Sequence, residues 1–164
     1  MKVKLIMGAI AFSLMATVAV GAEQRVKVQL TQPELDVNPY HRPYVAVWVE
    51  TPEREPIKTL AVWHEQDKWL KDLRQWWRKI GRDLQGLDGN SGATEKPGIY
   101  TIYWDGKDSK GKTLPNGEYL INIEAAREEG GRSYMRERIH LGSESEIIVA
   151  AEAEIGPVRI NTYQ

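Results

Sequence analysis

Residues 98–119 have the sequence GIYTIYWDGKDSKGKTLPNGEY. Aromatic and β-branched residues occupy positions 100–104 and begin again at Tyr119, whereas glycine, aspartate, lysine and proline fill the centre. This pattern predicts two β-strands, over 100–104 and 119–126, joined by a structured turn. Trp104 ends the first strand, and we expect its ring to anchor one sheet of the fold.

The turn over 105–117 has two alternative interpretations. Carboxylates such as Asp105 and Asp108 accept hydrogen bonds from turn amides, and glycines adopt positive φ angles without strain. The glycines placed for this are Gly106, Gly111 and Gly117. A calcium loop is the alternative, but Lys107 and Ser109 stand where that motif requires aspartate or asparagine. We therefore predict a structural turn.

Strand patterns continue on both sides of this stretch. Residues 44–50, YVAVWVE, are so dense in β-branched and aromatic residues that they predict a strand buried on both faces, paired with 57–63. Further strands are predicted at 25–30, 134–141, 146–154 and 158–163. Short strands separated by frequent turn signals are typical of an antiparallel β-sandwich.

Residues 67–84 have a different periodicity. Apolar residues recur there at helical spacing, namely Trp69, Leu70, Leu73, Trp76, Trp77, Ile80 and Leu84. The pattern predicts one amphipathic helix inserted into the sandwich. We expect the Trp76–Trp77 pair to enter a core, although stacking on a cofactor or partner is the alternative. The basic opposite face is expected to be solvated, with docking on anionic lipid or an acidic partner as the alternative.

Residues 98–119 resemble the immunoglobulin-like domain of the flagellar hook-capping protein FlgD, which has a similar strand, W-D-G-x-D-x-x-G turn and G-x-Y strand. The resemblance implies a mainly β fold, an immunoglobulin-like antiparallel β-sandwich, and implies no function. We expect one sandwich domain over 23–164, with the inserted amphipathic helix at about 67–84.

The first 22 residues predict a cleaved signal peptide. Lys2 and Lys4 precede an apolar run over 5–20, and Val20-Gly21-Ala22 provides small residues for cleavage. An uncleaved anchor is the alternative, but the run is shorter than the roughly 20 residues that span a bilayer. We expect a periplasmic protein that does not span the membrane in its mature form.

Composition excludes several classes of protein. The chain has no cysteine, which excludes disulfides, thiol chemistry and cysteine-ligated metal sites. A formal net charge of −1 excludes broad electrostatic binding to nucleic acid. His41, His64 and His140 lack the spacing of metal ligands, so no metal site is predicted.

A second resemblance covers most of the chain after the leader. It is carried by residues 44–50, 59–63, 69–77, 91–98 and 104–131. Together these segments resemble a family of predicted periplasmic proteins. Members are often encoded beside PepSY-type membrane proteins and flavin transferases of the ApbE type, and the resemblance implies these two as partners.

Residues 88–94, DGNSGAT, resemble the D-x-x-S-G-A-T acceptor motif of FMN-binding subunits in sodium-pumping and Rnf-type redox complexes. There a flavin transferase moves FMN from FAD onto the threonine hydroxyl and forms a phosphoester. The resemblance implies Thr94 as the acceptor. The recognition residues that it implies are Asp88, Ser91, Gly92 and Ala93.

The chemistry of this motif sets structural requirements. The Thr94 hydroxyl must enter another enzyme's site, so we expect residues 87–98 to form an exposed, unpaired loop. The attached ring needs an aromatic or apolar seat, and Trp76, Trp77 or Tyr100 lie nearby in sequence. His64, beside Glu65, could tune a flavin. The alternative is that this glycine-rich segment is an ordinary turn.

These patterns predict a periplasmic electron-transfer protein that carries FMN covalently on Thr94 and works with a membrane reductase. It would be a substrate of a flavin transferase rather than an enzyme. A cofactor-free periplasmic interaction or assembly module is the alternative. A hydrolase is a third possibility, which no motif supports.

Overall fold

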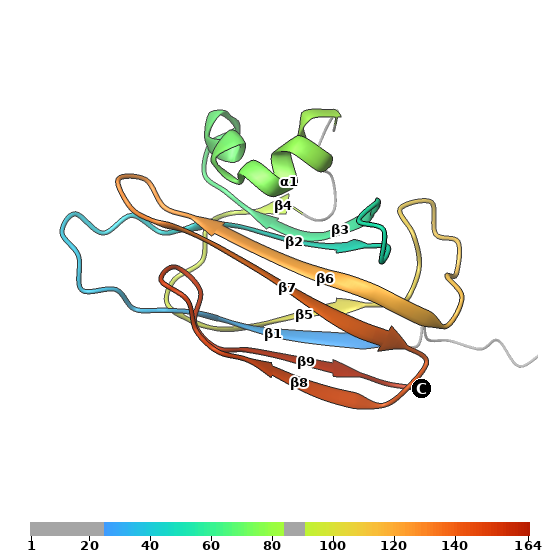
Figure 1. Cartoon of the computed structure of the whole chain (residues 1–164). Helices are drawn as coiled ribbons and strands as arrows, with labels where there is room; N and C mark the ends of the chain where they lie inside the picture. Colours follow the sequence, from blue (N-terminus) through green and yellow to red (C-terminus); the bar gives the residue numbers. More distant parts are fainter. Residues whose placement is uncertain (1–24, 84–90) are drawn as a thin grey trace, which may run out of the picture.

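The computed structural model describes residues 25–83 and 91–164 and has two facing β-sheets (Figure 1). One sheet has the strand order β5-β1-β9-β8, and the other β4-β3-β2-β6-β7. The strands are β1 (Val26–Gln32), β2 (Tyr44–Glu50), β3 (Pro56–Trp63), β4 (Ser91–Gly92), β5 (Gly98–Trp104), β6 (Gly117–Ala126), β7 (Arg132–Leu141), β8 (Ser145–Val149) and β9 (Val158–Thr162). This arrangement confirms the mainly β sandwich. The predicted signal peptide lies outside the described residues.

The predicted strand over 146–154 is wrong in its second half. β8 ends at Val149, and a short turn closed by a bridge between Glu152 and Ile155 follows. Glu154 is buried there, and its carboxylate accepts hydrogen bonds from the Arg127 guanidinium and the Gly131 amide. These contacts between distant parts of the chain stabilise the turn. The periodicity of the residues in a strand does not predict them.

The main core lies between the sheets, and β2 contributes to it from one of its two buried faces. Val45, Val47 and Val49 point into this core, whereas Ala46 and Trp48 belong to a second cluster on the opposite face of the sheet. Every residue of β2 is buried. The prediction of a strand buried on both faces is therefore confirmed.

The turn between β5 and β6 has the structure that its residues predict. The Asp108 carboxylate accepts hydrogen bonds from the amides of Lys110 and Lys112, both at 2.9 Å. Asp105 accepts one from the Lys107 amide at 3.2 Å. All three glycines have positive φ, with Gly106 at +72° and Gly111 at +80°. The Trp104 ring is buried in the main core.

The segment after β3 is helical but is not the single helix that its periodicity predicts. It consists of a 3₁₀ turn η1 (Asp67–Asp72), a short helix α1 (Arg74–Lys79) and a second 3₁₀ turn η2 (Gly81–Asp83). The backbone dihedral angles of Leu73, between η1 and α1, and of Ile80, between α1 and η2, are not helical. Because Leu70, Leu73 and Trp76 all pack on a twisted sheet, the backbone bends to follow that surface.

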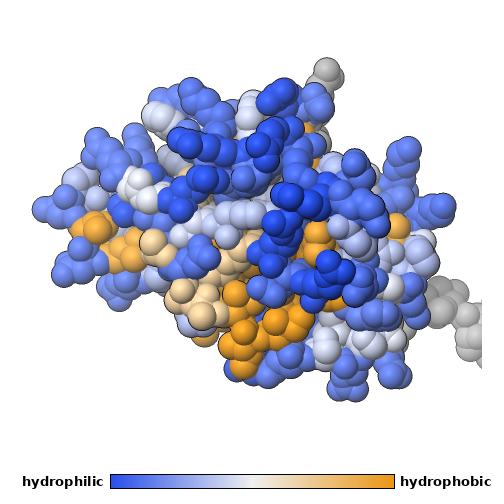
Figure 2. All heavy atoms as spheres, in the orientation of Figure 1, coloured by the Kyte–Doolittle hydropathy of each residue, from blue (hydrophilic) through white to orange (hydrophobic). Residues whose placement is uncertain are grey.

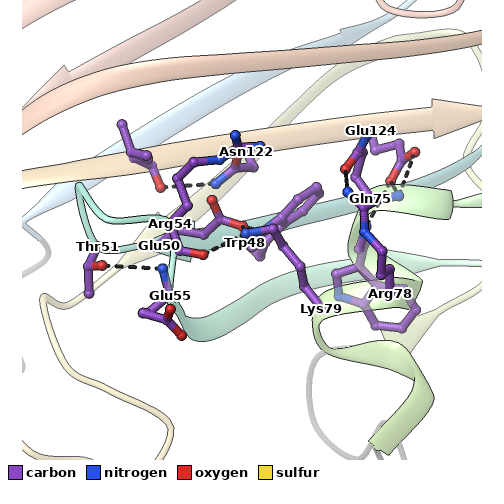
Figure 3. A network of polar contacts seen from close by, with 12 residues as sticks. Trp48, Glu50, Thr51, Arg54, Glu55, Gln75, Arg78, Lys79, Asn122 and Glu124 are labelled. Atoms are coloured by element: carbon purple, nitrogen blue, oxygen red, sulfur yellow. Dashed lines mark hydrogen bonds and ion pairs between the residues drawn. The ribbon is translucent and has the colours of Figure 1, made fainter.

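We call residues 67–83 the helical cover, because they lie on the face of the second sheet that points away from the first (Figure 1). Figure 3 shows the polar contacts that hold it there. The buried Glu124 carboxylate of β6 accepts hydrogen bonds from the Gln75 and Trp76 amides and pairs with Arg132. The sheet thus provides the acceptors that a short helix without a side-chain cap lacks.

A second buried carboxylate fastens the other end of the cover. Glu50 accepts a hydrogen bond from the Trp48 indole and pairs with Lys79 at 3.0 Å. The Trp76 ring is fully buried between cover and sheet, and its indole N–H donates to Thr59. The prediction that Trp76 enters a core is confirmed.

The outward side of the helical cover is hydrophilic (Figure 2). Its exposed basic residues are Lys68, Lys71, Arg74, Arg78 and Arg82. Figure 2 also shows hydrophobic residues gathered over the end of β8, where Ile148 is largely exposed. None of the helices in the described part of the chain is long and apolar enough to cross a membrane.

Candidate functional site

The acceptor-like motif lies at the edge of the second sheet. Ser91 and Gly92 form β4, which runs parallel to β3 and pairs with Val62 and Trp63. The prediction of an unpaired loop is therefore wrong at these two residues, because they extend the sheet by one short strand. Asp88 lies outside the described residues.

The side chains of the motif differ in exposure. Ser91, Gly92 and Ala93 are exposed, whereas Thr94 is only 4% exposed. The Thr94 hydroxyl donates a hydrogen bond to the Glu65 carboxylate at 2.9 Å. The expectation of a freely exposed acceptor hydroxyl is wrong in this conformation, since pairing with β3 sets the chain beside the residues that follow that strand.

Two consecutive residues after β3 hold the motif. The His64 backbone amide donates to the Gly92 carbonyl, and its side-chain Nε2 lies 2.9 Å from the Ser91 hydroxyl. Glu65 holds Thr94. We call His64 and Glu65, with these contacts, the clasp. In the sequence, His64 and Glu65 are separated from the motif by the residues of the helical cover. The parallel pairing of β4 with β3 brings them together in the fold.

A polar pocket of about 390 Å³ adjoins the clasp. It is lined by Tyr40, His41, Arg42, Tyr44, Glu65 and Glu128. Glu65 therefore belongs to both the clasp and the pocket, because the residue that accepts the Thr94 hydrogen bond also forms part of the pocket wall. Sequence reasoning missed this pocket, since its residues come from the β1–β2 connection, the end of β3 and the β6–β7 hairpin.

The pocket wall is electrostatically negative around Tyr44. Burial, followed by the charges of Glu128, Glu65 and Asp72, raises the pKa of Tyr44 to about 12. His41 lies 3.9 Å from Glu128. The Tyr40 hydroxyl is buried and has no hydrogen-bond partner within residues 25–83 and 91–164. A buried hydroxyl without a partner is unfavourable unless a ligand or water satisfies it.

An aromatic pair includes Trp63, the residue that pairs with Gly92 of the motif. The rings of Trp63 and Tyr100 meet edge to face with centroids 5.2 Å apart. A Cβ added to Gly92 would stand 3.7 Å from the Trp63 ring, so the backbone of Gly92 lies close to that ring. Of the aromatic seats predicted from sequence, Tyr100 packs against Trp63, the residue that pairs with Gly92, whereas Trp76 is fully enclosed beneath the helical cover.

No metal centre is formed by the described side chains, which include no group of three or more histidine, aspartate and glutamate residues placed to hold an ion. His64 contacts Ser91 and lies 3.5 Å from Asp67. In this structure it holds the motif in place.

Comparison with protein families places these features in context. Residues 25–157 match the family model described as predicted periplasmic protein, DUF2271. The chain belongs to the DUF2271 family. The protein is accordingly periplasmic. No curated protein and no solved structure matches the chain.

The DUF2271 match includes every described element that builds the site. It begins before β1 and ends in the turn before β9, so the clasp, the pocket and residues 91–94 of the motif all fall within it. The description of DUF2271 gives a compartment and no activity, and the function has to be argued from the chemistry of the site.

Proposed function

We propose that this protein is a periplasmic electron carrier with FMN attached covalently to Thr94. The observation that carries the proposal is the Thr94 hydroxyl, which occupies the acceptor position of a D-x-x-S-G-A-T sequence and lies one hydrogen bond from a pocket of ligand size. A periplasmic address suits this chemistry, because flavin transfer of this kind takes place outside the cytoplasm.

The attachment is a phosphoryl transfer. The Thr94 oxygen attacks the FMN phosphorus of FAD, the pyrophosphate bond breaks, AMP leaves and the hydroxyl proton is released. A flavin transferase of the ApbE type supplies FAD and the catalytic machinery. A PepSY-type membrane reductase is the proposed electron donor or acceptor.

The motif must separate from the clasp before the Thr94 hydroxyl can react. Its position at the edge of the sheet keeps the free-energy cost of this separation low. β4 is an edge strand of two residues, and the clasp holds it through the Gly92 carbonyl, the Ser91 hydroxyl and the Thr94 hydroxyl. Hydrogen bonds that exchange with water contribute about 1 kcal/mol each. Opening therefore costs a few kcal/mol, within reach of the binding energy of an enzyme.

Co-expression of the chain with an ApbE-type flavin transferase tests the proposal. We expect a mass gain equal to FMN minus water, mapped by peptide analysis to the fragment that contains Thr94. Thr94→Ala is expected to abolish the gain and to retain the fold, with a loss of stability of about 1 kcal/mol because the hydrogen bond to Glu65 is removed. Thr101→Ala, at an exposed threonine of β5, is the matched control and should keep the full mass gain.

An unmodified mass, obtained while a known acceptor protein is labelled in parallel, would overturn the proposal. Label retained in Thr94→Ala would refute the attachment site.

A cofactor-free interaction or assembly module is the second candidate. One observation favours it, since the Thr94 hydroxyl is enclosed and already hydrogen-bonded to Glu65. This candidate predicts that the chain stays unmodified beside an active transferase, whereas the loss of stability in Thr94→Ala is expected for either function.

A further inference from the structure

We propose that the outward side of the helical cover is a docking surface for an anionic lipid bilayer. The inference goes beyond the proposed function, because it does not depend on a flavin at Thr94. The partner is defined by its chemistry, namely phospholipid headgroups that give a membrane surface a net negative charge.

The cover presents a group of exposed cations that the protein does not neutralise. These are Lys68, Lys71, Arg74, Arg78 and Arg82. Within the described part of the chain none of them forms an ion pair, whereas Arg132 and Arg138 of β7 both pair with glutamates. Lys79, the sixth cation of the cover, pairs with the buried Glu50 beneath it. The five outward cations therefore remain available to a negatively charged surface.

The acidic residues of the cover do not interrupt this surface. Asp67 and Asp83 stand at its two ends, and Asp72 between them is only partly exposed, with its charge acting on Tyr44. Residues 67–83 contain six lysines and arginines and three aspartates, a net charge of +3, although the whole chain carries −1. The rest of the chain is therefore net negative, and this asymmetry turns the cover toward an anionic surface.

Two tryptophans of the cover suit a lipid interface. Trp69 and Trp77 pack on the cluster beneath the cover but stay partly exposed. The indole N–H groups of Trp48, Trp76 and Trp104 donate hydrogen bonds inside the protein, whereas those of Trp69 and Trp77 donate none to the described residues. A ring with an apolar body and a free donor is stabilised at the boundary between headgroups and water. Cations together with such rings are typical of segments that lie on anionic membranes.

The contact is expected to be peripheral. The apolar side of the cover is already packed on the second sheet, so it has no apolar face left to insert among acyl chains. Headgroups would contact the cations and the edges of the two rings. Binding held mainly by exposed charges is screened by salt, so the docking should depend strongly on ionic strength.

Docking through the cover would fix how the molecule faces the membrane. β4 is at the edge of the same sheet on which the cover lies (Figure 1). The first sheet lies on the far side of the molecule from the cover and would point away from the bilayer. The motif would thus be held near a membrane, where a membrane-bound reductase works.

The first test measures co-sedimentation of residues 23–164 with lipid vesicles. This chain contains every described element and lacks the apolar leader, which would itself bind lipid. We expect binding at about 0.15 M salt to vesicles of phosphatidylglycerol and phosphatidylcholine in equal parts, little binding to phosphatidylcholine alone, and release at about 1 M salt. Equal binding to both kinds of vesicle, or binding to neither, would overturn the proposal.

Matched double variants test whether the cover is the surface that binds. Each cation close to an anionic membrane strengthens binding about fivefold, so Lys71→Gln combined with Arg74→Gln should weaken it roughly 25-fold. Lys110→Gln combined with Lys112→Gln removes the same charge from the exposed turn between β5 and β6 and should bind like wild type. An equal loss in both double variants would show that net charge alone governs binding and would refute the docking surface. Far-ultraviolet circular dichroism checks that each variant is folded.

A fluorescent label tests the orientation. The chain has no cysteine, so one introduced cysteine gives a single site for an environment-sensitive dye. Gln66→Cys places the dye at the start of the cover, and Thr101→Cys places it at an exposed position of β5 in the first sheet. Anionic vesicles should brighten the dye several-fold at position 66 and leave it unchanged at position 101. A response at position 101 as large as that at position 66 would contradict the orientation.

An acidic protein is the competing partner for a basic surface. A poly-glutamate peptide that binds the chain and loses affinity with Lys71→Gln and Arg74→Gln, while anionic vesicles do not bind, would overturn the lipid assignment. The proposed function fails separately, because none of these measurements involves flavin. Vesicle binding without a mass gain at Thr94 would support the docking surface alone, and a mass gain without vesicle binding would support the proposed function alone.

Discussion

Tyr44 shows how one residue connects the fold to the candidate site. Its ring belongs to the cluster beneath the helical cover, whereas its hydroxyl end faces the carboxylates of the pocket. Burial and the charges of Glu128 and Glu65 raise the pKa of Tyr44 from 10.0 to about 12. The folded state therefore keeps a proton that the unfolded chain releases at lower pH.

Replacement of this residue by phenylalanine makes the linkage visible. Because the folded pKa is raised, the contribution of Tyr44 to stability is fully present below about pH 10 and is lost as pH rises through about 12. A shift of this size corresponds to about 3 kcal/mol. We expect urea unfolding between about pH 9 and pH 12 to show a shallower loss of stability in Tyr44→Phe than in wild type. Parallel curves for the two proteins would contradict this assignment.

At the scale of the element, the helical cover shows why a periodic sequence need not form one helix. Its apolar residues are spaced as a helix requires, but the surface beneath them is a twisted sheet with two buried carboxylates at fixed places. The cover is divided into short helical turns. In this conformation the Glu124 carboxylate accepts hydrogen bonds from amides of α1, and the Glu50 carboxylate pairs with Lys79. Tertiary packing outweighs local propensity here.

Gly81 tests how tightly this element is packed. A Cβ added there would stand 2.5 Å from the Trp76 ring and 2.8 Å from the Trp77 ring. Although alanine is the better helix former, we expect Gly81→Ala to lower the free energy of unfolding by about 1–3 kcal/mol, because both rings must shift. Denaturant unfolding followed by tryptophan fluorescence measures the change.

A glycine in open space provides the control for this substitution. Gly111 has a φ of +80° and no atom within 4 Å of an added Cβ, and asparagine tolerates that backbone conformation. Gly111→Asn should therefore change stability much less than Gly81→Ala does. A stabilised Gly81→Ala protein would show that the cover is packed more loosely than the structure indicates.

At the scale of the whole molecule, the two clusters share one sheet. The valines of β2 pack in the core between the sheets, whereas Trp48 and its neighbours pack in the cluster under the helical cover. Because both clusters pack on β2, disruption of this strand would expose apolar residues of both clusters. This arrangement favours a single cooperative transition.

We expect the urea transition of residues 23–164 to coincide when followed by tryptophan fluorescence and by far-ultraviolet circular dichroism. Since the chain has no cysteine, a reducing agent should leave the midpoint unchanged. Loss of fluorescence at a lower urea concentration than the loss of strand signal would show instead that the helical cover unfolds as a separate unit.

The sequence by itself determined the parts of this protein that rest on local chemistry. The density of β-branched and aromatic residues predicted a strand buried on both faces over 44–50 and a further strand over 100–104. The aspartates and glycines of 105–117 predicted the turn, because these preferences act within a few residues. The motif around Thr94 was likewise visible as a string of residues, although its attachment chemistry stays a prediction.

Only the tertiary structure decided what surrounds that motif. The clasp of His64 and Glu65, the pocket around Tyr40 and the division of the helical cover all depend on contacts between residues far apart in the chain. Thr94 is enclosed because β4 pairs with β3, although the helical cover separates the two strands in the sequence. No local sequence pattern predicts that pairing. The position of an edge strand follows from which surfaces remain available once the sheets have packed, and this is a property of the whole fold.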